Sequence, residues 1–390
     1  MTSGLVNRRV LRILSLNYEF PPIGGGGGNA HQHILREFRN YPDIDLTLIT
    51  TTPQPELYGS SYSPNVRIVF LPQKKKDLLY WRRSEIVEYL ACHYGFLRTH
   101  LQKEAYDLCH VFFGFPSGFL AYLHRKRLPY IVSVRGSDVP GYNRRFSLDY
   151  VLLRPMLKRI YRSSQRVIAN SRGLKELYEK QFPDLRAGVI PNGIDAATFT
   201  PRREKDWEEW RLVCAARLIA RKGIDLLLQA CQRLVEDGIN FSCHLIGDGP
   251  EESSLKRMAG ELRLGERICF HGRMSRDEIA RFLPNCDLFV LPSYAEGMSN
   301  AALEAMACGL PVLLTDTGGS RELIEGNGEI VPVGDAEALA SALMRMLAQP
   351  EIMRRLGVRS RERAETFSWN NVAAQYYDLY GQIARHAGIW

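Results

Sequence analysis

The sequence of 390 residues lacks a long hydrophobic run, a cysteine pair motif and any short internal repeat. No segment approaches the ~18 consecutive apolar residues of a membrane-spanning helix, so an integral membrane protein is not expected. The basic start NRRVLR is followed by only a short apolar stretch, ILSL, and by no small-residue cleavage site, so no secretory signal peptide is expected. The eight cysteines form no CxxC pair and lie mostly in apolar segments. They predict reduced, buried thiols in a cytoplasmic protein rather than a disulfide framework or a zinc site.

Size and charge set the next limits. A chain of 390 residues is too long for one ordinary core, so two domains are expected. Hydrophobic residues make up 45% and charged residues 24%, which is typical of a globular protein. The net charge of +8 is uneven, because residues 1–200 carry +12 and residues 201–390 carry −4. One domain is therefore expected to face an anionic partner, and nucleic acid, a lipid surface and a phosphorylated substrate remain open.

Strand-like segments alternate with helical patterns, and the alternation starts afresh near residue 211. In the first half, strands are expected over residues 10–18, 44–51, 66–72, 108–114, 129–136, 166–171 and 187–193. Helical patterns cover residues 30–41, 84–104 and 119–127. In the second half, strands are expected over residues 211–218, 241–250 with its turn, 266–272, 286–293, 310–316 and 328–333. This alternation predicts an α/β protein with parallel sheets and crossover helices.

The organisation predicts two Rossmann-like, doubly wound domains that face a shared cleft. The first covers residues 1–195 and the second residues 205–367, with a linker in PNGIDAATFTPRREK. Ligands of such sheets bind at the carboxyl ends of the strands. The loops that follow the strands are therefore the candidate binding segments.

Five glycines, Gly24–Gly28, lie between the first strand and the first helix. Glycines at this place let backbone N–H groups approach a phosphate or sugar, and the helix N-terminus adds positive charge. The spacing is not a G-x-G-x-x-G motif in its usual register, and Thr50–Thr52 stand where an acidic residue would close the second strand. Both features disfavour a nicotinamide dinucleotide. A merely flexible loop is the alternative.

Two cations follow the first strand of the second half, in the segment ARLIARKG. Arg217 and Lys222, with Gly223 opening a helix, suit a diphosphate. Arg221 adds a third charge nearby, so a solvated basic loop is the alternative.

Two glutamates stand in and before the alanine-rich segment SYAEGMSNAALEAMACGLPV. Residues Asn300 to Cys308 predict a short, deeply packed helix that stops at Gly309. Glu304 lies in its middle, although a carboxylate is rarely buried without a partner. A sugar diol such as a ribose would satisfy Glu304, and Glu296 would then lie nearer the reacting sugar. A buried arginine partner for Glu304 is the alternative.

Other strand ends are less informative. The turns GDGPE (247–251) and FHG (270–272) allow close backbone approach, but plain turns are the simpler explanation. His244 is interpreted as a core or edge histidine. The pair Asp43 and Asp45 has metal-like spacing but precedes a strand, so a solvated loop is the better interpretation.

Together these segments resemble the family 4 retaining glycosyltransferases, which have the GT-B fold. EGMSNAALEAMACGLPVLLTDTGGSRELI is similar to the E-x7-E signature of that family. FPPIGGGGG resembles its first glycine-rich loop, VIPNGIDAATFTP its linker, ARLIARKG its phosphate loop, LIGDGPE its nucleotide-side turn and FHG its base-contacting strand end. FSWNNVAAQYYDLY resembles its final helix, which implies that residues 368–390 pack back on the first domain.

The resemblance implies a role for each matched residue. Arg217 and Lys222 would bind the donor diphosphate. Glu304 would hold the ribose hydroxyls and Glu296 would contact the transferred sugar, so Glu296, Arg217 and Lys222 are the expected catalytic residues. The matched loops would supply the other donor contacts, from Gly27, Gly28, Gly249, His271, Gly297, Met298, Ser299 and Asn300. The resemblance implies no metal and no cofactor, and a donor that is a UDP-, GDP- or ADP-sugar.

One loop departs from the family pattern. Where many members have histidine in an HGTD-like loop, this chain has VRGSDVPGY, with Arg135 before Gly136 and Asp138. Arginine cannot act as a base near neutral pH, but it can bind a donor phosphate or an anionic acceptor. Arg135 and Asp138 are expected on the acceptor side. His31 and His33 lie in a different register from common members and receive no role.

The sequence as a whole predicts a cytoplasmic, metal-independent, retaining hexosyltransferase of polysaccharide, lipopolysaccharide or glycolipid biosynthesis. It would move a sugar from a nucleotide diphosphate sugar to an acceptor hydroxyl. In the expected front-face mechanism, the leaving phosphate, stabilised by Arg217 and Lys222, helps to deprotonate the acceptor. Two alternatives remain, a GT-B epimerase that uses the same donor and a basic protein that binds nucleic acid or anionic lipid without turnover. The intact set of Arg217, Lys222, Glu296 and Glu304 disfavours the second.

Residues 73–103 suggest a membrane-facing acceptor side. They combine basic with apolar and aromatic side chains: Lys74, Lys75, Lys76, Arg82 and Arg83 with Leu78, Leu79, Tyr80 and Trp81. Such a mixture suits an anionic bilayer. We expect peripheral association with the inner face of the cell membrane and a lipid-linked or otherwise membrane-bound saccharide acceptor. The alternative is a solvated basic loop with Trp81 packed in the core.

Overall fold

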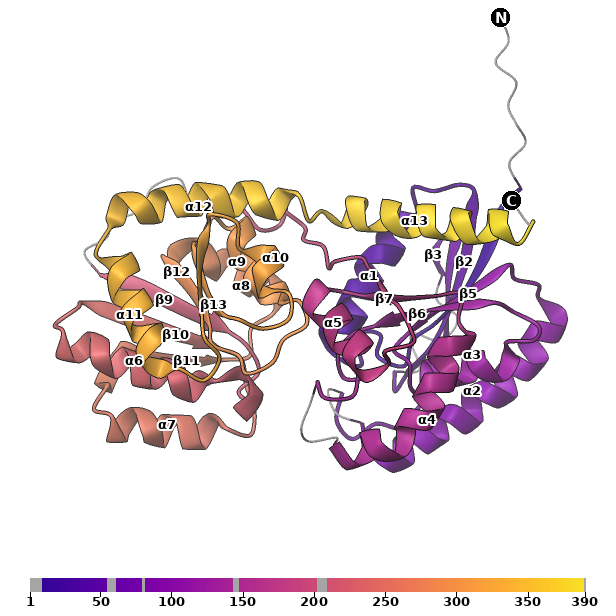
Figure 1. Cartoon of the computed structure of the whole chain (residues 1–390), viewed down its shortest axis with the longest axis horizontal. Helices are drawn as coiled ribbons and strands as arrows, with labels where there is room; N and C mark the ends of the chain where they lie inside the picture. Colours follow the sequence, from indigo (N-terminus) through magenta and orange to yellow (C-terminus); the bar gives the residue numbers. More distant parts are fainter. Residues whose placement is uncertain (1–8, 55–60, 79–80, 143–146, 202–208, 389–390) are drawn as a thin grey trace, which may run out of the picture. The chain divides into compact units, whose positions relative to one another are not determined.

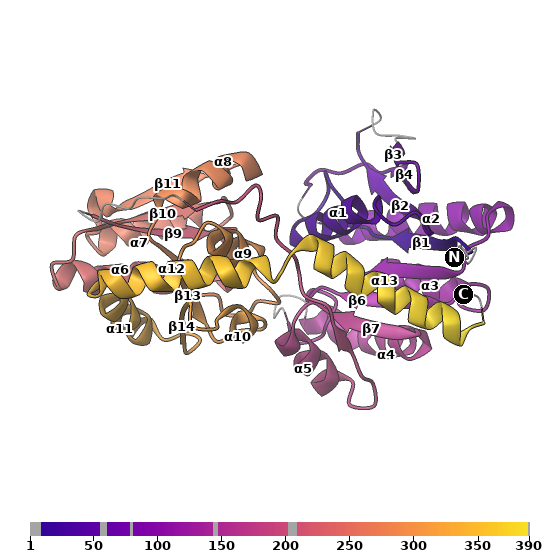
Figure 2. The same ribbon diagram turned by 90° about the horizontal axis from the view of Figure 1, so that it is seen from above.

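The computed structural model describes residues 9–54, 61–78, 81–142, 147–201 and 209–388. The chain forms two compact units (Figures 1 and 2). The N-terminal unit comprises residues 1–170, 174–191 and 369–390, and the C-terminal unit comprises residues 171–173 and 192–368. Each unit has a largely parallel sheet with helices around it, which confirms the prediction of two Rossmann-like domains.

The N-terminal unit contains an eight-stranded sheet in the order β3-β4-β2-β1-β5-β6-β7-β8. The strands are β1 (Leu11–Leu16), β2 (Ile44–Thr52), β3 (Ser61–Ser63), β4 (Val66–Pro72), β5 (Leu108–Phe112), β6 (Tyr130–Val134), β7 (Arg166–Ala169) and β8 (Gly188–Val189). Only the pairing of β3 with β4 is antiparallel among the described strands of this sheet. The direction of strand addition reverses between β1 and β5, so the loops after these two strands are the favoured ligand position of this sheet.

Helices cover both faces of the N-terminal sheet (Figure 1). They are α1 (Gly26–Phe38), α2 (Arg83–Lys103), α3 (Ser117–His124), α4 (Ser147–Ser163), α5 (Arg172–Gln181) and α13 (Trp369–His386). Helix α13 packs against α1, whereas α2, α3 and α4 form a row on the opposite face. The last described helix of the chain is therefore part of the first unit.

The C-terminal unit contains a six-stranded, fully parallel sheet in the order β11-β10-β9-β12-β13-β14. Its strands are β9 (Trp210–Ala215), β10 (Phe241–Ile246), β11 (Ile268–Gly272), β12 (Leu288–Leu291), β13 (Val312–Thr315) and β14 (Gly328–Val331). Its α-helices are α6 (Ile224–Glu236), α7 (Glu252–Glu261), α8 (Arg276–Phe282), α9 (Asn300–Ala307), α10 (Ser320–Leu323), α11 (Ala336–Leu347) and α12 (Pro350–Glu365). Here the strand order reverses between β9 and β12.

Several features of the N-terminal unit differ from the sequence prediction. Strand β3 and helices α4 and α5 were not predicted, and α4 carries Pro155 in its interior, a residue that normally signals a helix end. Helix α1 begins at Gly26, four residues before the predicted start. A Cβ on Gly27 would lie 2.7 Å from the Phe113 ring, and one on Gly28 would collide with the carbonyl oxygen of Glu19. These glycines therefore let the first turn of the helix pack closely against the loops after β1 and β5.

Each unit has its own hydrophobic core, and most cysteines lie in these cores. All eight cysteines are free, and six of them are buried, which agrees with the predicted buried thiols. None of the helices in the described ranges has the length and apolar character needed to cross a membrane.

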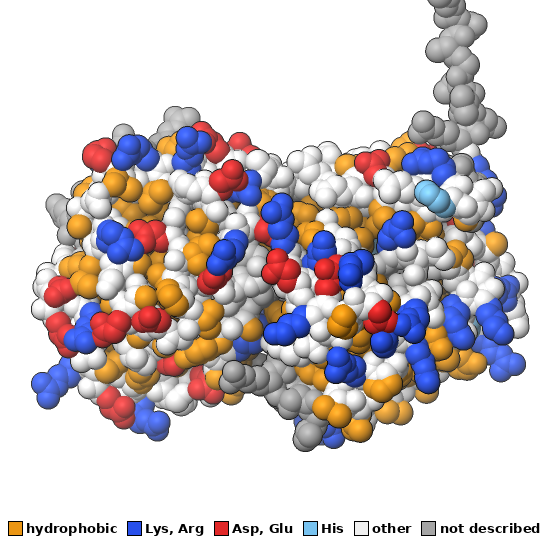
Figure 3. Space-filling model, in the orientation of Figure 1, with side chains coloured by type: hydrophobic (Ala, Val, Ile, Leu, Met, Phe, Trp, Pro, Cys, Tyr) orange, Lys and Arg blue, Asp and Glu red, His pale blue; other side chains and the backbone are white. Residues whose placement is uncertain are grey.

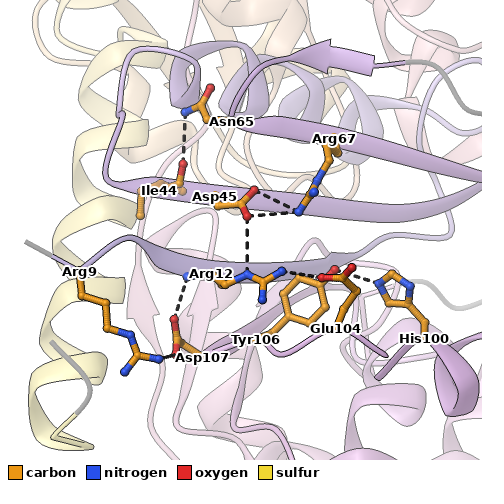
Figure 4. Close-up of polar contacts among 10 residues, drawn as sticks. All are labelled: Arg9, Arg12, Ile44, Asp45, Asn65, Arg67, His100, Glu104, Tyr106 and Asp107. Carbon is orange, nitrogen blue, oxygen red and sulfur yellow. Dashed lines mark hydrogen bonds and ion pairs between the residues drawn. The ribbon is translucent and has the colours of Figure 1, made fainter. Parts of the chain in front are cut away.

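The amino-terminal ends of the N-terminal strands carry a network of charges (Figure 4). Asp45 at the start of β2 forms ion pairs with Arg12 at 3.6 Å and Arg67 at 3.2 Å, and Arg12 also pairs with Glu104 at 2.6 Å. Asp107 accepts a hydrogen bond from the backbone N–H of Arg12 at 2.8 Å. Asp45 thus neutralises arginines on neighbouring strands, at the edge of the sheet opposite the candidate ligand loops.

A tyrosine links α13 to the same edge. The Tyr377 hydroxyl donates to Asp43 Oδ2 at 2.5 Å, just before β2. Loss of a hydrogen bond to a charged acceptor changes a local opening equilibrium roughly tenfold or more. We therefore expect Tyr377→Phe to accelerate amide exchange along α13 by about that factor, as measured by hydrogen–deuterium exchange. Tyr94→Phe, a change at an exposed ring on α2, is the matched control, and equal exchange in both variants would contradict this anchoring role.

Candidate functional site

The point of strand reversal in the C-terminal sheet brings together two loops that carry predicted site residues. Arg217 and Lys222 follow β9, and Glu296 follows β12, the adjacent strand. Because both loops leave carboxyl ends of neighbouring parallel strands, they meet at one edge of the sheet.

Lys222 and Glu296 form a close ion pair at this edge. The Lys222 Nζ atom lies 2.5 Å from Glu296 Oε1 and 3.0 Å from Oε2. The two side chains are only 13% and 10% exposed, so solvent screens their attraction weakly. The two residues predicted to contact phosphate and sugar are thus held side by side.

Backbone contacts fix the two loops to each other. The N–H of Tyr294 donates to the carbonyl oxygen of Arg221 at 2.8 Å, and the Arg221 Nη1 atom donates to the carbonyl oxygen of Ala295 at 3.0 Å. Gly223 has a φ of +65°, and a Cβ there would collide with the carbonyl oxygen of Pro292. Arg221, which the sequence presented as one of three loop charges, is a structural link between the loops.

The loop after β13 also contacts the segment from Glu296 to Asn300. The N–H of Gly319, after β13, donates to the carbonyl oxygen of Gly297 at 2.5 Å, and Gly318 packs directly on the Glu296 carbonyl. The predicted donor-binding segment is therefore anchored on both sides by backbone contacts.

Helix α9 begins at this segment, as predicted. Ser299 is its N-cap and accepts a hydrogen bond from the N–H of Ala302 at 3.2 Å. The cap thus satisfies one of the N–H groups of the first turn of α9. Met298 is buried, and the Asn300 side chain accepts a hydrogen bond from Asn192 Nδ2 at 2.8 Å. Asn192 lies in the linker motif PNG, and the sequence reasoning gave it no role.

Glu304 lies one turn into α9, on an otherwise apolar and alanine-rich helix. Its carboxylate accepts no hydrogen bond from any side chain or backbone group in the described part of the chain. Burial raises the pKa of the Glu304 carboxyl to about 7, against the opposing effect of the positive charge of Arg276. Arg276 itself pairs with Asp195 at 3.4 Å, so it is a distant influence rather than the buried arginine partner considered from the sequence.

Gly249 and His271 lie at the ends of β10 and β11. A Cβ on Gly249 would collide with the Leu218 carbonyl oxygen, so this glycine lets the loops after β10 and β9 pack together. The exposed His271 ring pairs with His244, with 2.9 Å between His271 Nε2 and His244 Nδ1. Burial lowers the pKa of His244 to about 4 and lowers that of His271 as well, so both rings are neutral near neutral pH.

The remaining predicted residues lie in the N-terminal unit. Gly27 and Gly28 form the first turn of α1, beside the loop after β5. Arg135 directly follows β6, and its guanidinium lies 4.5 Å from the centre of the Phe112 ring. A Cβ on Gly27 would lie 3.7 Å from Arg135 Cγ, which places this arginine beside the N-terminus of α1.

Asp138 organises the loop that carries Arg135. Its carboxylate accepts hydrogen bonds from the backbone N–H groups of Gly114 at 2.8 Å, Arg135 at 2.9 Å and Gly136 at 3.1 Å. Asp138 is only 4% exposed, and burial raises its pKa despite these three bonds. Its predicted contact with an acceptor stays a prediction.

No group of three or more potential metal ligands among histidine, cysteine, aspartate and glutamate occurs within the described ranges. The predicted independence from metal stays a prediction that a chelator test addresses.

Two family models match consecutive parts of the chain and together span residues 24–363. The model described as "Glycosyltransferase Family 4" matches residues 24–198, and "Glycosyl transferases group 1" matches residues 197–363. An uncharacterized glycosyltransferase of Methanocaldococcus jannaschii is 27% identical over 96% of this chain and 99% of its own length. The N-acetyl-alpha-D-glucosaminyl L-malate synthase of Bacillus anthracis is 27% identical over 73% of this chain and 77% of its own length.

Solved structures share the fold. A sucrose-phosphate synthase from Thermosynechococcus elongatus superposes with a TM-score of 0.81 at 24% identity, over 96% of this chain and all of that one. Anabaena HepE, in complex with UDP-glucose, superposes with a TM-score of 0.71 at 18% identity, over 95% of this chain and all of that one.

The Glu304 carboxyl should make the folding stability of the protein depend on pH. Its pKa in the folded state is raised to about 7, so its favourable contribution is present below the ordinary glutamate pKa and is lost as the pH rises through about 7. We expect the melting temperature of the unmodified protein, relative to Glu304→Gln, to fall between about pH 5 and about pH 8. Glu266→Gln at an exposed site is the control. A difference that does not change with pH would contradict the raised pKa.

Proposed function

Because this chain is a GT-B glycosyltransferase of the family 4 type, we propose that it transfers a hexose from a nucleoside diphosphate sugar to an acceptor hydroxyl. We further propose that the anomeric configuration is retained and that no metal is required. The observation that carries the proposal is the Lys222–Glu296 pair at the reversal point of the C-terminal sheet.

The geometry of this pair suits a nucleotide sugar. In such a donor the distal phosphate and the sugar ring are joined through one oxygen, so their binding groups must lie close together. Lys222 suits the phosphate and Glu296 suits a sugar hydroxyl, and the two side chains are 2.5–3.0 Å apart. Arg217, from the same loop as Lys222, adds a second charge for the diphosphate.

Glu304 suits the ribose of the donor. A vicinal diol donates two hydrogen bonds to a carboxylate, and this carboxylate receives none from the described residues. The base is then expected toward the ends of β10 and β11, where Gly249 and His271 lie.

The proposed mechanism keeps acceptor and leaving group on the same face of the sugar. The bond between the anomeric carbon and the phosphate oxygen breaks, and the acceptor oxygen bonds to that carbon. The acceptor proton passes to the departing phosphate. Arg217 and Lys222 stabilise the negative charge that develops on the leaving group.

We propose an acceptor that carries an anionic group, bound by Arg135. Arginine stands where many family members have histidine, and the Bacillus anthracis relative is named for an L-malate product. Relatives named as an amylovoran biosynthesis glycosyltransferase and a phosphatidylinositol monomannoside mannosyltransferase support a role in polysaccharide or glycolipid biosynthesis.

The function is tested with a panel of UDP-, GDP- and ADP-sugars. A specific donor stabilises the fold by about 2.7 kcal/mol at one hundred times its Kd, which a thermal shift detects. Glu304→Gln is expected to weaken donor binding roughly tenfold or more. Transfer should persist in EDTA. Isomerised donor formed without acceptor would indicate an epimerase instead, and no binding of any donor would contradict the proposal.

Arg217→Ala and Lys222→Ala are each expected to lower kcat/KM by roughly 100-fold, because each removes a preorganised charge at the leaving group. Lys256→Ala, at an exposed lysine of the same unit that pairs with Glu252, is the control and should remain near normal. Near-normal turnover in Lys222→Ala would place the reaction elsewhere.

We also propose peripheral membrane association, with a main contact surface other than the predicted segment. Several residues of that segment are exposed as predicted: Lys74, Lys76, Leu78, Arg82 and Arg83. Two others are not. Lys75 Nζ is fully covered, lies 3.0 Å from Glu85 and stands 3.9 Å over the Trp81 ring. Trp81 is partly buried and packs against Tyr18, so neither the Lys75 ammonium nor the packed face of Trp81 is open to a bilayer. Leu79 and Tyr80 lie outside the described residues.

The outer faces of α2, α3 and α4 provide the alternative surface. Figure 3 shows hydrophobic and basic side chains interspersed over this part of the N-terminal unit. Val151 and Leu152 on α4 are 70% and 78% exposed. Exposed basic residues on or near the same helices are Arg98, Lys126, Arg127, Arg154 and Arg159. Apolar side chains among cations suit an anionic bilayer.

Sedimentation with anionic vesicles tests this surface. Val151→Ser combined with Leu152→Ser is expected to reduce vesicle binding roughly tenfold or more, because two aliphatic side chains no longer enter the bilayer. Binding should also weaken with salt. Val333→Ser combined with Val358→Ser, at exposed aliphatics of the C-terminal unit, is the control. Equal loss in both double variants, or no vesicle binding at low salt, would contradict the proposal.

A further inference from the structure

A chain of buried polar groups in the N-terminal unit connects helix α13 to Arg135. The Arg135 Nη2 atom donates to the Tyr376 hydroxyl at 3.3 Å, and this hydroxyl lies 2.9 Å from Ser133 Oγ. Ser133 Oγ lies 2.7 Å from His110 Nε2, and His110 Nδ1 lies 2.6 Å from the Tyr380 hydroxyl. Tyr376, Ser133, His110 and Tyr380 are each at most 1% exposed. The sequence reasoning assigned none of these four residues a role.

The positive charge of Arg135 determines which group donates and which accepts in each hydrogen bond of this network. A guanidinium only donates hydrogen bonds, so the Tyr376 oxygen accepts one from Arg135. The Tyr376 hydroxyl then donates its own hydrogen bond to Ser133 Oγ. Ser133 then donates to His110 Nε2, and His110 carries its proton on Nδ1 and donates to Tyr380. In this order every O–H and N–H dipole points away from the positive charge, which is the favourable arrangement.

This direction requires a neutral His110. Burial and the charge of Arg135 both lower the pKa of His110 well below its ordinary value, so the imidazole is neutral at physiological pH. Helix α13 thus meets Arg135 through uncharged groups with defined donor and acceptor roles.

A second branch supports the His110 end from β1 and α1. The Ser15 hydroxyl donates to the carbonyl oxygen of His110 at 2.9 Å and therefore accepts from His31 Nε2 at 3.1 Å. His31 Nδ1 then accepts from Asn17 Nδ2 at 3.1 Å. Burial also lowers the pKa of His31 well below its ordinary value, so this branch is neutral too. His31, which received no role from the sequence, is a support of the network.

Arg135 is also held by two further contacts. Its guanidinium lies over the Phe112 ring, and its backbone N–H is fixed by the Asp138 carboxylate. Among these contacts, the hydrogen bond to the Tyr376 hydroxyl is the one that connects the guanidinium to α13.

We propose that Tyr376 is a positioning residue that fixes the Arg135 guanidinium for the anionic group of the acceptor. The inference rests on the proposed function of Arg135. Helix α13, which follows the whole C-terminal unit in sequence, would then orient the guanidinium of Arg135. If Tyr376 had a merely structural role, Tyr376→Phe and Tyr380→Phe should have the same effect, because both residues are buried tyrosines of α13 in the same hydrogen-bond network. Of these two tyrosines, Tyr376 accepts a hydrogen bond from Arg135, whereas the hydroxyl of Tyr380 is bonded to His110.

The first experiment needs no acceptor. In protein labelled with ¹⁵N-arginine, the Arg135 side-chain signal is assigned with Arg135→Lys, and its guanidinium rotation is measured by NMR. Tyr376→Phe is expected to accelerate this rotation roughly tenfold, as loss of one bond to a charged donor predicts. Tyr380→Phe should leave the rotation unchanged. Equal rotation rates in Tyr376→Phe and Tyr380→Phe would overturn the proposal.

The second experiment uses matched acceptor probes, sn-glycerol 3-phosphate against glycerol and glucose 6-phosphate against glucose. Tyr376→Phe is expected to raise KM for the phosphorylated probe roughly tenfold, with unchanged KM for the donor. Tyr380→Phe should leave the preference for the phosphorylated probe intact. In the variant Arg135→Lys, adding Tyr376→Phe should produce no further change, because Tyr376 acts through Arg135.

The two experiments separate the two proposals. Transfer that never prefers a phosphorylated probe contradicts the anionic acceptor, whereas the NMR result still decides the positioning role. Additive effects of Tyr376→Phe and Arg135→Lys on KM would show that Tyr376 acts independently of Arg135 and would overturn the inference. If Tyr376→Phe lowers folding stability, Ser133→Ala is the second variant, since it removes the bond behind Tyr376 and should also accelerate Arg135 rotation.

Discussion

The ion pair between Lys222 and Glu296 connects the two loops on which the candidate donor site depends. The two side chains are only 13% and 10% exposed, so loss of either partner would leave a poorly solvated charge unpaired. Their pairing requires that the loops after β9 and β12 meet closely. This approach is possible because Gly223 leaves room for the carbonyl group of Pro292, while Gly318, after β13, leaves room for that of Glu296. The electrostatic requirement and the backbone packing thus support one arrangement of the strand ends.

Much of the fold follows from the sequence because parallel strands have a clear signature. Strand β4 was predicted with its observed bounds, and β2 and β11 differ by one or two residues. The failures have physical causes. Helix α4 contains Pro155, which reads as a helix end in the sequence, whereas its packing against α3 is not visible there. Strand β3 has three residues and pairs at the sheet edge, too short for an alternating pattern to be visible.

The candidate site was predictable where chemistry and spacing coincide. Glu304 was recognisable because a carboxylate within alanines needs an explanation. The pairing of Lys222 with Glu296 was not, because these residues are 74 positions apart and the sequence suggested a separate ligand for each. The buried network behind Arg135 was equally hidden, since His110 and Tyr380 are 270 positions apart and either residue alone looks like an ordinary core side chain.

The placement of α13 has a consequence for biosynthesis. The ribosome synthesises the C-terminal unit before it makes this helix. The face of β5 and β6 that contacts Tyr376 and Tyr380 therefore stays uncovered while nearly half of the chain is synthesised. Until α13 arrives, His110 and Ser133 lack their hydroxyl partners from Tyr380 and Tyr376. A nascent chain therefore cannot assemble the Arg135 network before its C-terminal unit has been synthesised, and a polypeptide released early would lack the hydroxyl groups of Tyr376 and Tyr380.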